Sequence, residues 1–133
     1  MTLHLLDTNI VSHIMRRDDQ VVLRRLRELD TEDVTISAVT KGELLFGLAK
    51  RSNVPALTQA IREFLQTIAV LPWTDETAET YGSLRARCTA RGVGLSALDM
   101  MIAAHAVSIG ATLVSRDKAF GQIGDELKVV DWV

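Results

Sequence analysis

The chain has 133 residues, of which 47% are hydrophobic, so it is long and apolar enough for one domain with a proper core. Fifteen lysine and arginine residues against 17 acidic residues give a net charge of −2, which argues against a strongly cationic nucleic-acid binder but allows a local basic patch. A lone cysteine excludes an intrachain disulfide, and no segment is long and apolar enough to cross a membrane. The N-terminus lacks a signal-peptide pattern, so we expect a cytoplasmic protein.

The predicted elements alternate between short strands and helices. In chain order they are strand 3–6, helix 20–30, strand 34–36, helices 39–50 and 54–67, strand 68–71, helices 75–89 and 97–109, and strands 111–114 and 128–130. The strands are nearly continuous apolar runs, as expected for a parallel sheet that is covered on both faces. A break at 52–55 separates two helices, and Gly110 is placed to end the last one. The alternation predicts one domain over residues 1–133, with a three-layer α/β/α fold around a mostly parallel sheet of four to five strands.

Four acidic residues are placed to meet at one edge of this sheet. Asp7 directly follows the first strand, and Asp117 comes shortly after the fourth. Glu43 and Asp99 lie early in two helices that begin at the same edge, because a crossover helix runs antiparallel to its strands. Open α/β sheets bind ligands at the carboxyl ends of their strands. We therefore expect these four carboxylates to converge on a functional site.

Converging carboxylates suggest a metal site. Like charges held close together resist ionisation and destabilise the fold unless a cation neutralises them. Ligand sets made only of oxygen atoms suit Mg²⁺ or Mn²⁺. Such an ion lowers the pKa of a bound water and stabilises charge on a phosphate, and nearby helix N-termini favour an anionic substrate. The cluster therefore predicts a metal-dependent phosphodiesterase site.

Each acid also has a purely structural interpretation. Asp7 can cap a helix or turn after its strand, and Asp99 can balance a helix dipole. Glu43 can be an exposed helix residue, and Asp117 can belong to a charged turn between two basic residues. The metal-site prediction therefore depends on the convergence of the four acids and not on any single one.

At these acids the sequence resembles a known family. The segments LLDTNI, ISAVTKGELLFG, LSALDMMIAAHA and ATLVSRDKAF surround the four carboxylates in turn, and KVVDW follows near the C-terminus. Together they resemble the PIN-domain ribonucleases, and specifically the VapC toxins of type II VapBC toxin–antitoxin pairs. The LDTN start and the D-x-x-I-A-A-H-A segment are specific in combination and in this order. The resemblance extends over nearly the whole chain.

The resemblance implies an endoribonuclease in which a water bound to Mg²⁺ or Mn²⁺ attacks an RNA phosphodiester bond. It implies that the metal ligands and catalytic residues are Asp7, Glu43, Asp99 and Asp117. Neighbouring groups would orient a carboxylate or a water molecule, namely Thr8, Asn9 and Ser115. Many relatives have an Asn-containing turn at the last motif, whereas this chain has Arg116, so direct ligation by Asp117 stays open.

The resemblance also implies partners. A VapB-type antitoxin would block the active-site groove, the toxin would be a homodimer, and the complex would bind its operator DNA through the antitoxin. A transfer RNA, a ribosomal RNA or a messenger RNA would all suit the same chemistry, because contacts to phosphate carry no sequence code. The number of metal ions, one or two, is also left open.

Several other residues have more than one interpretation. A basic stretch can contact RNA phosphates, form a solvated helix face or contact the antitoxin, and it comprises Arg16, Arg17, Arg24, Arg25 and Arg27. The three histidines show no ligand spacing, and we expect His105 to pack in the core. Trp73 and Trp132 follow strand ends and are predicted to be core or dimer residues.

Two other classes of protein share parts of this pattern. A receiver-like signalling domain has a similar size and alternation. It needs paired acids after its first strand and a lysine after a later one, where this chain has only Asp7 and then Ser115. A catalytically inactive interaction module would keep the same fold, but the complete set of four acids argues against it.

Overall fold

In the part of the chain that the structure describes, five parallel strands in the order β3-β2-β1-β4-β5 form the central sheet. The computed structural model describes residues 2–17, 19–51 and 54–132. The strands are β1 (His4–Leu6), β2 (Val34–Ser37), β3 (Ala69–Leu71), β4 (Thr112–Val114) and β5 (Val129–Val130). Each neighbouring pair is parallel, which confirms the predicted sheet. The strand order differs from the 2-1-3-4-5 order of receiver-type folds, so that alternative is wrong.

Helices connect the strands. They are α1 (Thr8–Arg16), α2 (Gln20–Arg27), α3 (Ala38–Lys50), α4 (Pro55–Thr67), α5 (Asp75–Ala90) and α6 (Ala97–Ile109), with 3-10 helices η1 (Thr31–Asp33) and η2 (Lys118–Ile123). Five of these α-helices agree with the predictions to within one turn, and Gly110 ends α6 in the left-handed conformation, at φ 68°. The predicted break at 52–55 includes residues 52 and 53, which lie outside the described residues. In the described part of the chain, no helix has the length and apolar character needed to cross a membrane.

Helix α1 was not predicted from the sequence. Its residues, TNIVSHIMR, include several β-branched side chains with modest helix propensity, and it starts directly after β1 with no linker. Two features do signal it: Asp7 is a good N-cap residue, and the buried side chains Ile10 and Ile14 are separated by one helical turn. Arg17 ends the helix in the left-handed region, at φ 53°.

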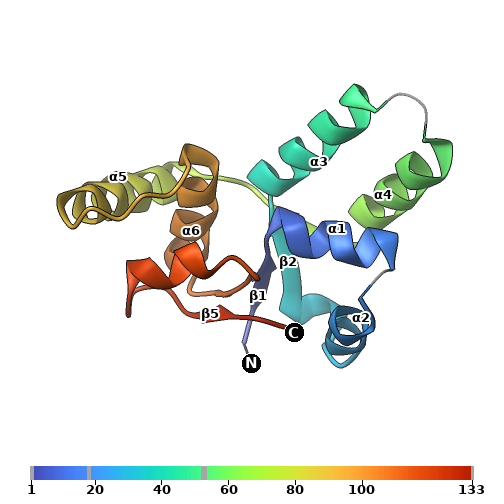
Figure 1. The fold of residues 1–133 in the computed structure, drawn as a ribbon, viewed down its shortest axis with the longest axis horizontal. Helices are drawn as coiled ribbons and strands as arrows, with labels where there is room; N and C mark the ends of the chain where they lie inside the picture. Colours follow the sequence, from blue (N-terminus) through green and yellow to red (C-terminus); the bar gives the residue numbers. More distant parts are fainter. Residues whose placement is uncertain (1, 18, 52–53, 133) are drawn as a thin grey trace.

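The sheet divides the core into two apolar clusters. Helices α5 and α6 lie on one side of the sheet, and α1 to α4 lie on the other (Figure 1). Leu5 and Leu113 pack in the first cluster, whereas Leu6 and Val114 pack in the second, because successive side chains of a strand point to opposite faces. Full burial of such a side chain contributes about 1.5–3 kcal/mol. Trp132 belongs to the second cluster, as predicted, and the three-layer fold is confirmed.

The carboxyl ends of β1 and β4 lie side by side at the predicted edge. Leu6 pairs with Val114 in register, and the backbone N–H of Asp7 donates to the carbonyl oxygen of Val114 at 3.1 Å. The residues that follow these two strands therefore emerge next to each other. This is the edge at which parallel α/β sheets bind their ligands.

Candidate active site

Asp7 lies where β1 passes into α1. Its Oδ1 accepts the backbone N–H of Ile10 at 2.9 Å and thereby caps α1. The residue is only 5% exposed, and this burial is the main cause of a raised pKa for Asp7. Hydrogen bonds from Ser115 and Ile10 partly oppose the rise in pKa, while the charges of Asp99 and Asp117 add to it. Asp7 is therefore both a helix cap and a buried carboxylate with acidic neighbours.

Asp99 and Asp117 reach this edge from two other segments. Asp99 is in the first turn of α6, where its backbone N–H donates to the Ser96 hydroxyl at 3.1 Å. Asp117 caps η2, since its Oδ1 accepts the backbone N–H of Ala119 at 2.9 Å. Asp99 is half-buried and Asp117 is exposed, and both are close enough to Asp7 to raise its pKa. The structure thus brings three of the predicted acids close enough together for their charges to interact.

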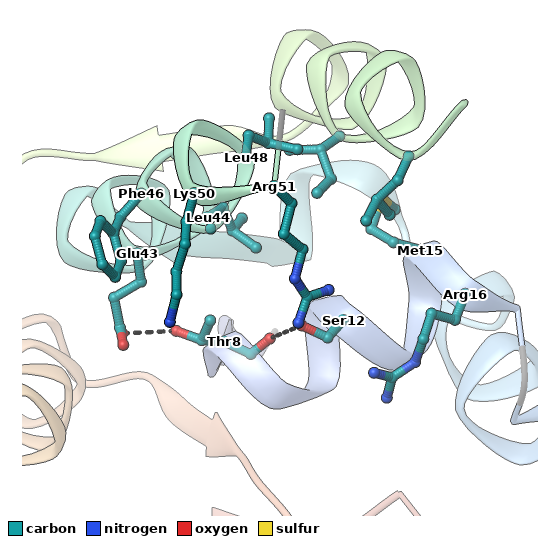
Figure 2. A pocket seen from close by; sticks show the side chains of 13 residues that line it. Thr8, Ser12, Met15, Arg16, Glu43, Leu44, Phe46, Leu48, Lys50 and Arg51 are labelled. Carbon is teal, nitrogen blue, oxygen red and sulfur yellow. Dashed lines mark hydrogen bonds between the residues drawn. The ribbon is translucent and has the colours of Figure 1, made fainter. Parts of the chain in front are cut away.

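Glu43 joins the site through Thr8. It lies in the second turn of α3, and the Thr8 hydroxyl donates to its Oε1 at 2.8 Å (Figure 2). Because Thr8 directly follows Asp7, this bond connects α3 to the start of α1 and orients the Glu43 carboxylate. Asn9 was also expected to orient a carboxylate or a water. It is exposed, and its side chain makes no hydrogen bond to a described residue.

Arg116 holds the turn that carries Asp117. The Ser115 hydroxyl accepts the backbone N–H of Asp117 at 3.0 Å, which closes the turn after β4. The Arg116 guanidinium donates to Asp19 at 2.5 Å and lies 3.9 Å from Asp131. A backbone N–H at the start of α2, together with the charge of Arg116, lowers the pKa of Asp19. Through its ion pair with Asp19, Arg116 thus connects the Asp117 turn to the start of α2.

A buried pair that was not predicted from the sequence connects the end of β2, directly before α3, to α6. His105 Nδ1 lies 2.7 Å from the Ser37 hydroxyl, which also caps α3 by accepting the backbone N–H of Val39 at 3.1 Å. Burial lowers the pKa of His105, and the residue packs in the interior as predicted. The pair fixes the relative position of the helices that carry Glu43 and Asp99. The feature of the sequence that could have indicated this pair is Ser37, a capping residue between a strand and a helix.

The donor set fits a hard divalent cation. Among residues 2–17, 19–51 and 54–132, no three Asp, Glu, His or Cys side chains lie close enough to hold one metal ion. The four acids nonetheless offer only oxygen donors, which Mg²⁺ and Mn²⁺ prefer. A cation would also stabilise the ionised form of Asp7, whose pKa is raised by burial and by two like charges. By donor atom and by electrostatics, the residues present suit such an ion.

Two hollows adjoin Glu43 on α3. The first has a volume of about 260 Å³, lies between α1, α3 and α4, and is lined by Lys50 and Arg51 among others (Figure 2). The second has a volume of about 560 Å³ and extends to Leu98 on α6. Phe46 and Glu43 line both hollows, so both adjoin the acidic site.

Comparison with known proteins assigns the family. The family model of the PIN domain matches residues 4–126. The chain is 31% identical over 134 residues to Ribonuclease VapC2 of Haemophilus influenzae, with 100% of both chains covered. It is 33% identical over 130 residues to the tRNA(fMet)-specific endonuclease VapC of Shigella flexneri, with 96% of each covered.

Solved structures agree with this match. The crystal structure of FitAcB from Neisseria gonorrhoeae superposes with a TM-score of 0.87 at 28% identity and covers 98% of both chains. DNA-bound VapBC from Salmonella typhimurium superposes with a TM-score of 0.86 at 26% identity and covers 100% of both chains. The chain belongs to the PIN-domain family and, within it, to the group of VapC ribonucleases.

Proposed function

We propose that this chain is the toxin of a type II toxin–antitoxin pair and that it hydrolyses RNA phosphodiester bonds as an endoribonuclease. Relatives that match over nearly their full length are named ribonucleases or RNA endonucleases. Another relative, 34% identical over 121 residues, is named toxin FitB, from Neisseria gonorrhoeae. The observation that supports the site in this chain is geometric: β1 and β4 end side by side just before Asp7 and the Asp117 turn, and Thr8 holds the Glu43 carboxylate next to Asp7.

In this proposal the carboxylates hold Mg²⁺ or Mn²⁺ next to the scissile phosphate. The metal ligands and catalytic acids are Asp7, Glu43, Asp99 and Asp117. When bound, such an ion makes a coordinated water more acidic and stabilises negative charge on the phosphate.

The chain's own residues set the geometry of this site. The Thr8 hydroxyl orients the Glu43 carboxylate, and the Ser115 hydroxyl holds the turn that carries Asp117. The N-termini of α1 and α6 lie beside the acids and favour an anionic substrate, because their free N–H groups carry partial positive charge.

The proposal includes the partners expected from the resemblance. Solved structures with this fold include DNA-bound VapBC from Salmonella typhimurium, at 26% identity, and FitAB bound to an IR36 DNA fragment, at 28% identity. We propose a VapB-type antitoxin as the inhibitor, a homodimeric toxin, and operator DNA bound through the antitoxin. The Shigella relative is named for its action on tRNA(fMet), which makes transfer RNA the first substrate to test in this chain. A single domain over residues 1–133 and a cytoplasmic location are part of the same proposal.

RNA cleavage by the purified chain tests the proposal. With Mg²⁺ or Mn²⁺ the protein should cut transfer RNA or total RNA, and EDTA should stop the reaction. Asp99→Asn should lower the cleavage rate by more than about 100-fold, since even residues that only orient metal ligands contribute about 10–100-fold. Asp125→Asn makes the same charge change at an exposed residue after η2 and should cleave like wild type.

Two outcomes would overturn the proposal. One is cleavage that persists in EDTA in a preparation without contaminating nuclease. The other is an Asp99→Asn variant as active as the Asp125→Asn control.

A further inference from the structure

Phe46 is a large apolar side chain that the fold leaves in solvent. It is 69% exposed, more than any other large hydrophobic side chain in the described residues. It stands three residues after Glu43 on α3, so the two side chains share one face of the helix. The ring belongs to neither apolar cluster of the core. Its packing therefore does not explain an aromatic side chain at this position.

Two glycines of α3 adjoin open space near this ring. Gly47 lines the hollow between α1, α3 and α4, and Gly42 lines the one that extends toward α6. A Cβ atom at either glycine would meet nothing within 4 Å. Glycine inside a helix is less favourable than alanine, so α3 gives up stability where it adjoins Glu43. The result is a projecting aromatic ring flanked by open space.

The hollow between α1, α3 and α4 is positively charged. Lys50 and Arg51 line it, and no carboxylate in the described part of the chain forms an ion pair with either. Among the described residues that line this hollow, Glu43 is the only acid. Lys50 Nζ lies 6.0 Å from the centroid of the Phe46 ring. An aromatic ring and unpaired cations thus lie together, within one or two helical turns of Glu43 (Figure 2).

We propose that Phe46, Lys50 and Arg51 form a nucleotide subsite beside the acidic cluster, where a base of single-stranded RNA stacks on Phe46 and an adjacent phosphate contacts Lys50 and Arg51. Aromatic side chains bind unpaired bases of any sequence, and positively charged grooves follow the RNA backbone. The charge of the hollow complements a phosphate. Because Glu43 borders the subsite, the bound nucleotide would place the strand next to the metal-binding carboxylates. This inference depends on the proposed ribonuclease function.

Binding of a fluorescein-labelled single-stranded oligoribonucleotide tests the subsite separately from cleavage. In EDTA, Phe46→Ala should raise the Kd about 5- to 150-fold, the range for loss of one stacked base. Phe46→Trp keeps an aromatic face and should bind within about threefold of wild type, whereas Phe46→Leu keeps only apolar bulk and should bind weakly. Val54→Ala alters another exposed apolar side chain, which lines neither hollow, and should bind like wild type.

The charge of the first hollow can be tested in the same binding assay, and its open space can be tested by cleavage kinetics with Mg²⁺ or Mn²⁺. Lys50→Gln should weaken binding and reduce the salt-dependence slope by about 0.7, the value for one phosphate contact in a single strand. Lys41→Gln is a matched control, because Lys41 is an exposed cation of α3 that lines neither hollow. Gly47→Leu should fill the first hollow and raise the KM for RNA, while the melting temperature stays the same or rises.

Each outcome separates the subsite from the ribonuclease proposal. If wild type cleaves RNA and Phe46→Ala binds and cleaves equally well, the subsite is refuted and the ribonuclease proposal stands. The subsite is also refuted if Phe46→Ala keeps RNA binding but loses antitoxin binding, or if it melts several degrees lower. A wild-type protein that neither binds nor cleaves RNA would refute the ribonuclease proposal and the subsite with it.

Discussion

Two roles of Asp7, as a helix cap and as a buried charge, can be separated by substitution. Asparagine caps helices about as well as aspartate, so Asp7→Asn should keep the bond from the Ile10 N–H while removing the charge. The lost carboxylate is one whose pKa is raised, mainly by burial and further by Asp99 and Asp117. In EDTA at pH 7, Asp7→Asn should therefore be at least as stable as wild type. It should nonetheless lose RNA cleavage.

Asp7→Ala removes the helix cap as well as the charge, so its comparison with Asp7→Asn measures the cap alone. Its cost should be about 1–2 kcal/mol, because the buried N–H of Ile10 then has no side-chain partner. With an unfolding entropy of about 2.1 cal/mol/K per residue, a chain of 133 residues loses about 3.5 °C of melting temperature per kcal/mol. Asp7→Ala should therefore melt about 4–7 °C below Asp7→Asn.

The pH dependence has a definite sign. The folded pKa of Asp7 is above its ordinary value of 3.8, so the folded state holds this proton more tightly than the unfolded state. Its contribution to stability is full below pH 3.8 and is lost as the pH rises through the folded pKa. In EDTA, wild type should therefore lose stability relative to Asp7→Asn across that window and then level off.

Thermal unfolding in EDTA and with added metal measures both effects. Mg²⁺ or Mn²⁺ at 100 times its Kd should stabilise wild type by about 2.7 kcal/mol, and should stabilise Asp7→Asn much less. If Asp7→Asn melts as low as Asp7→Ala in EDTA, the buried charge of Asp7 does not destabilise the fold. The assignment of Asp7 as a ligand fails if Asp7→Asn cleaves RNA and responds to metal like wild type.

Other bonds of the structure can be tested in the same way. Thr8→Val removes the hydroxyl that donates to Glu43 but keeps the shape of the threonine side chain. It should lower the cleavage rate about 10–100-fold with little change in melting temperature. A variant with wild-type activity would show that this bond does not orient Glu43. For His105, burial lowers the folded pKa below the ordinary value of 6.5, so the free energy of unfolding should fall as pH falls from 6.5 through the folded pKa. His105→Gln should flatten that slope in urea unfolding at several pH values, and an unchanged slope would contradict the assignment. Gly110→Ala should lower stability by about 1 kcal/mol, because φ is 68° there, whereas Gly82→Ala inside α5 should raise it by about 0.5–1 kcal/mol. Thermal melts that change in the same direction for both glycines would contradict the backbone argument.

The layer order and the edge that carries the acids followed from local patterns. Short apolar runs separated by helical periodicity indicate buried parallel strands, and parallel strands place their carboxyl ends together. Asp7 and Asp117 could therefore be placed at one edge without any distance being known. Helix α1, which was not predicted, shows the limit of such patterns, because its β-branched composition hid a helix that Asp7 caps and that buries Ile10 and Ile14.

Contacts between distant segments could be seen only in the folded chain. Thr8 and Glu43 are 35 residues apart, Ser37 and His105 are 68 apart, and Asp19 and Arg116 are 97 apart. Periodicity shows which face of an element is buried, but it carries no information about which side chains of two elements meet. That depends on strand register and on how the helices pack over the sheet. The same packing opens the two hollows beside Glu43, where α3 faces α1 and α4 on one side and α6 on the other.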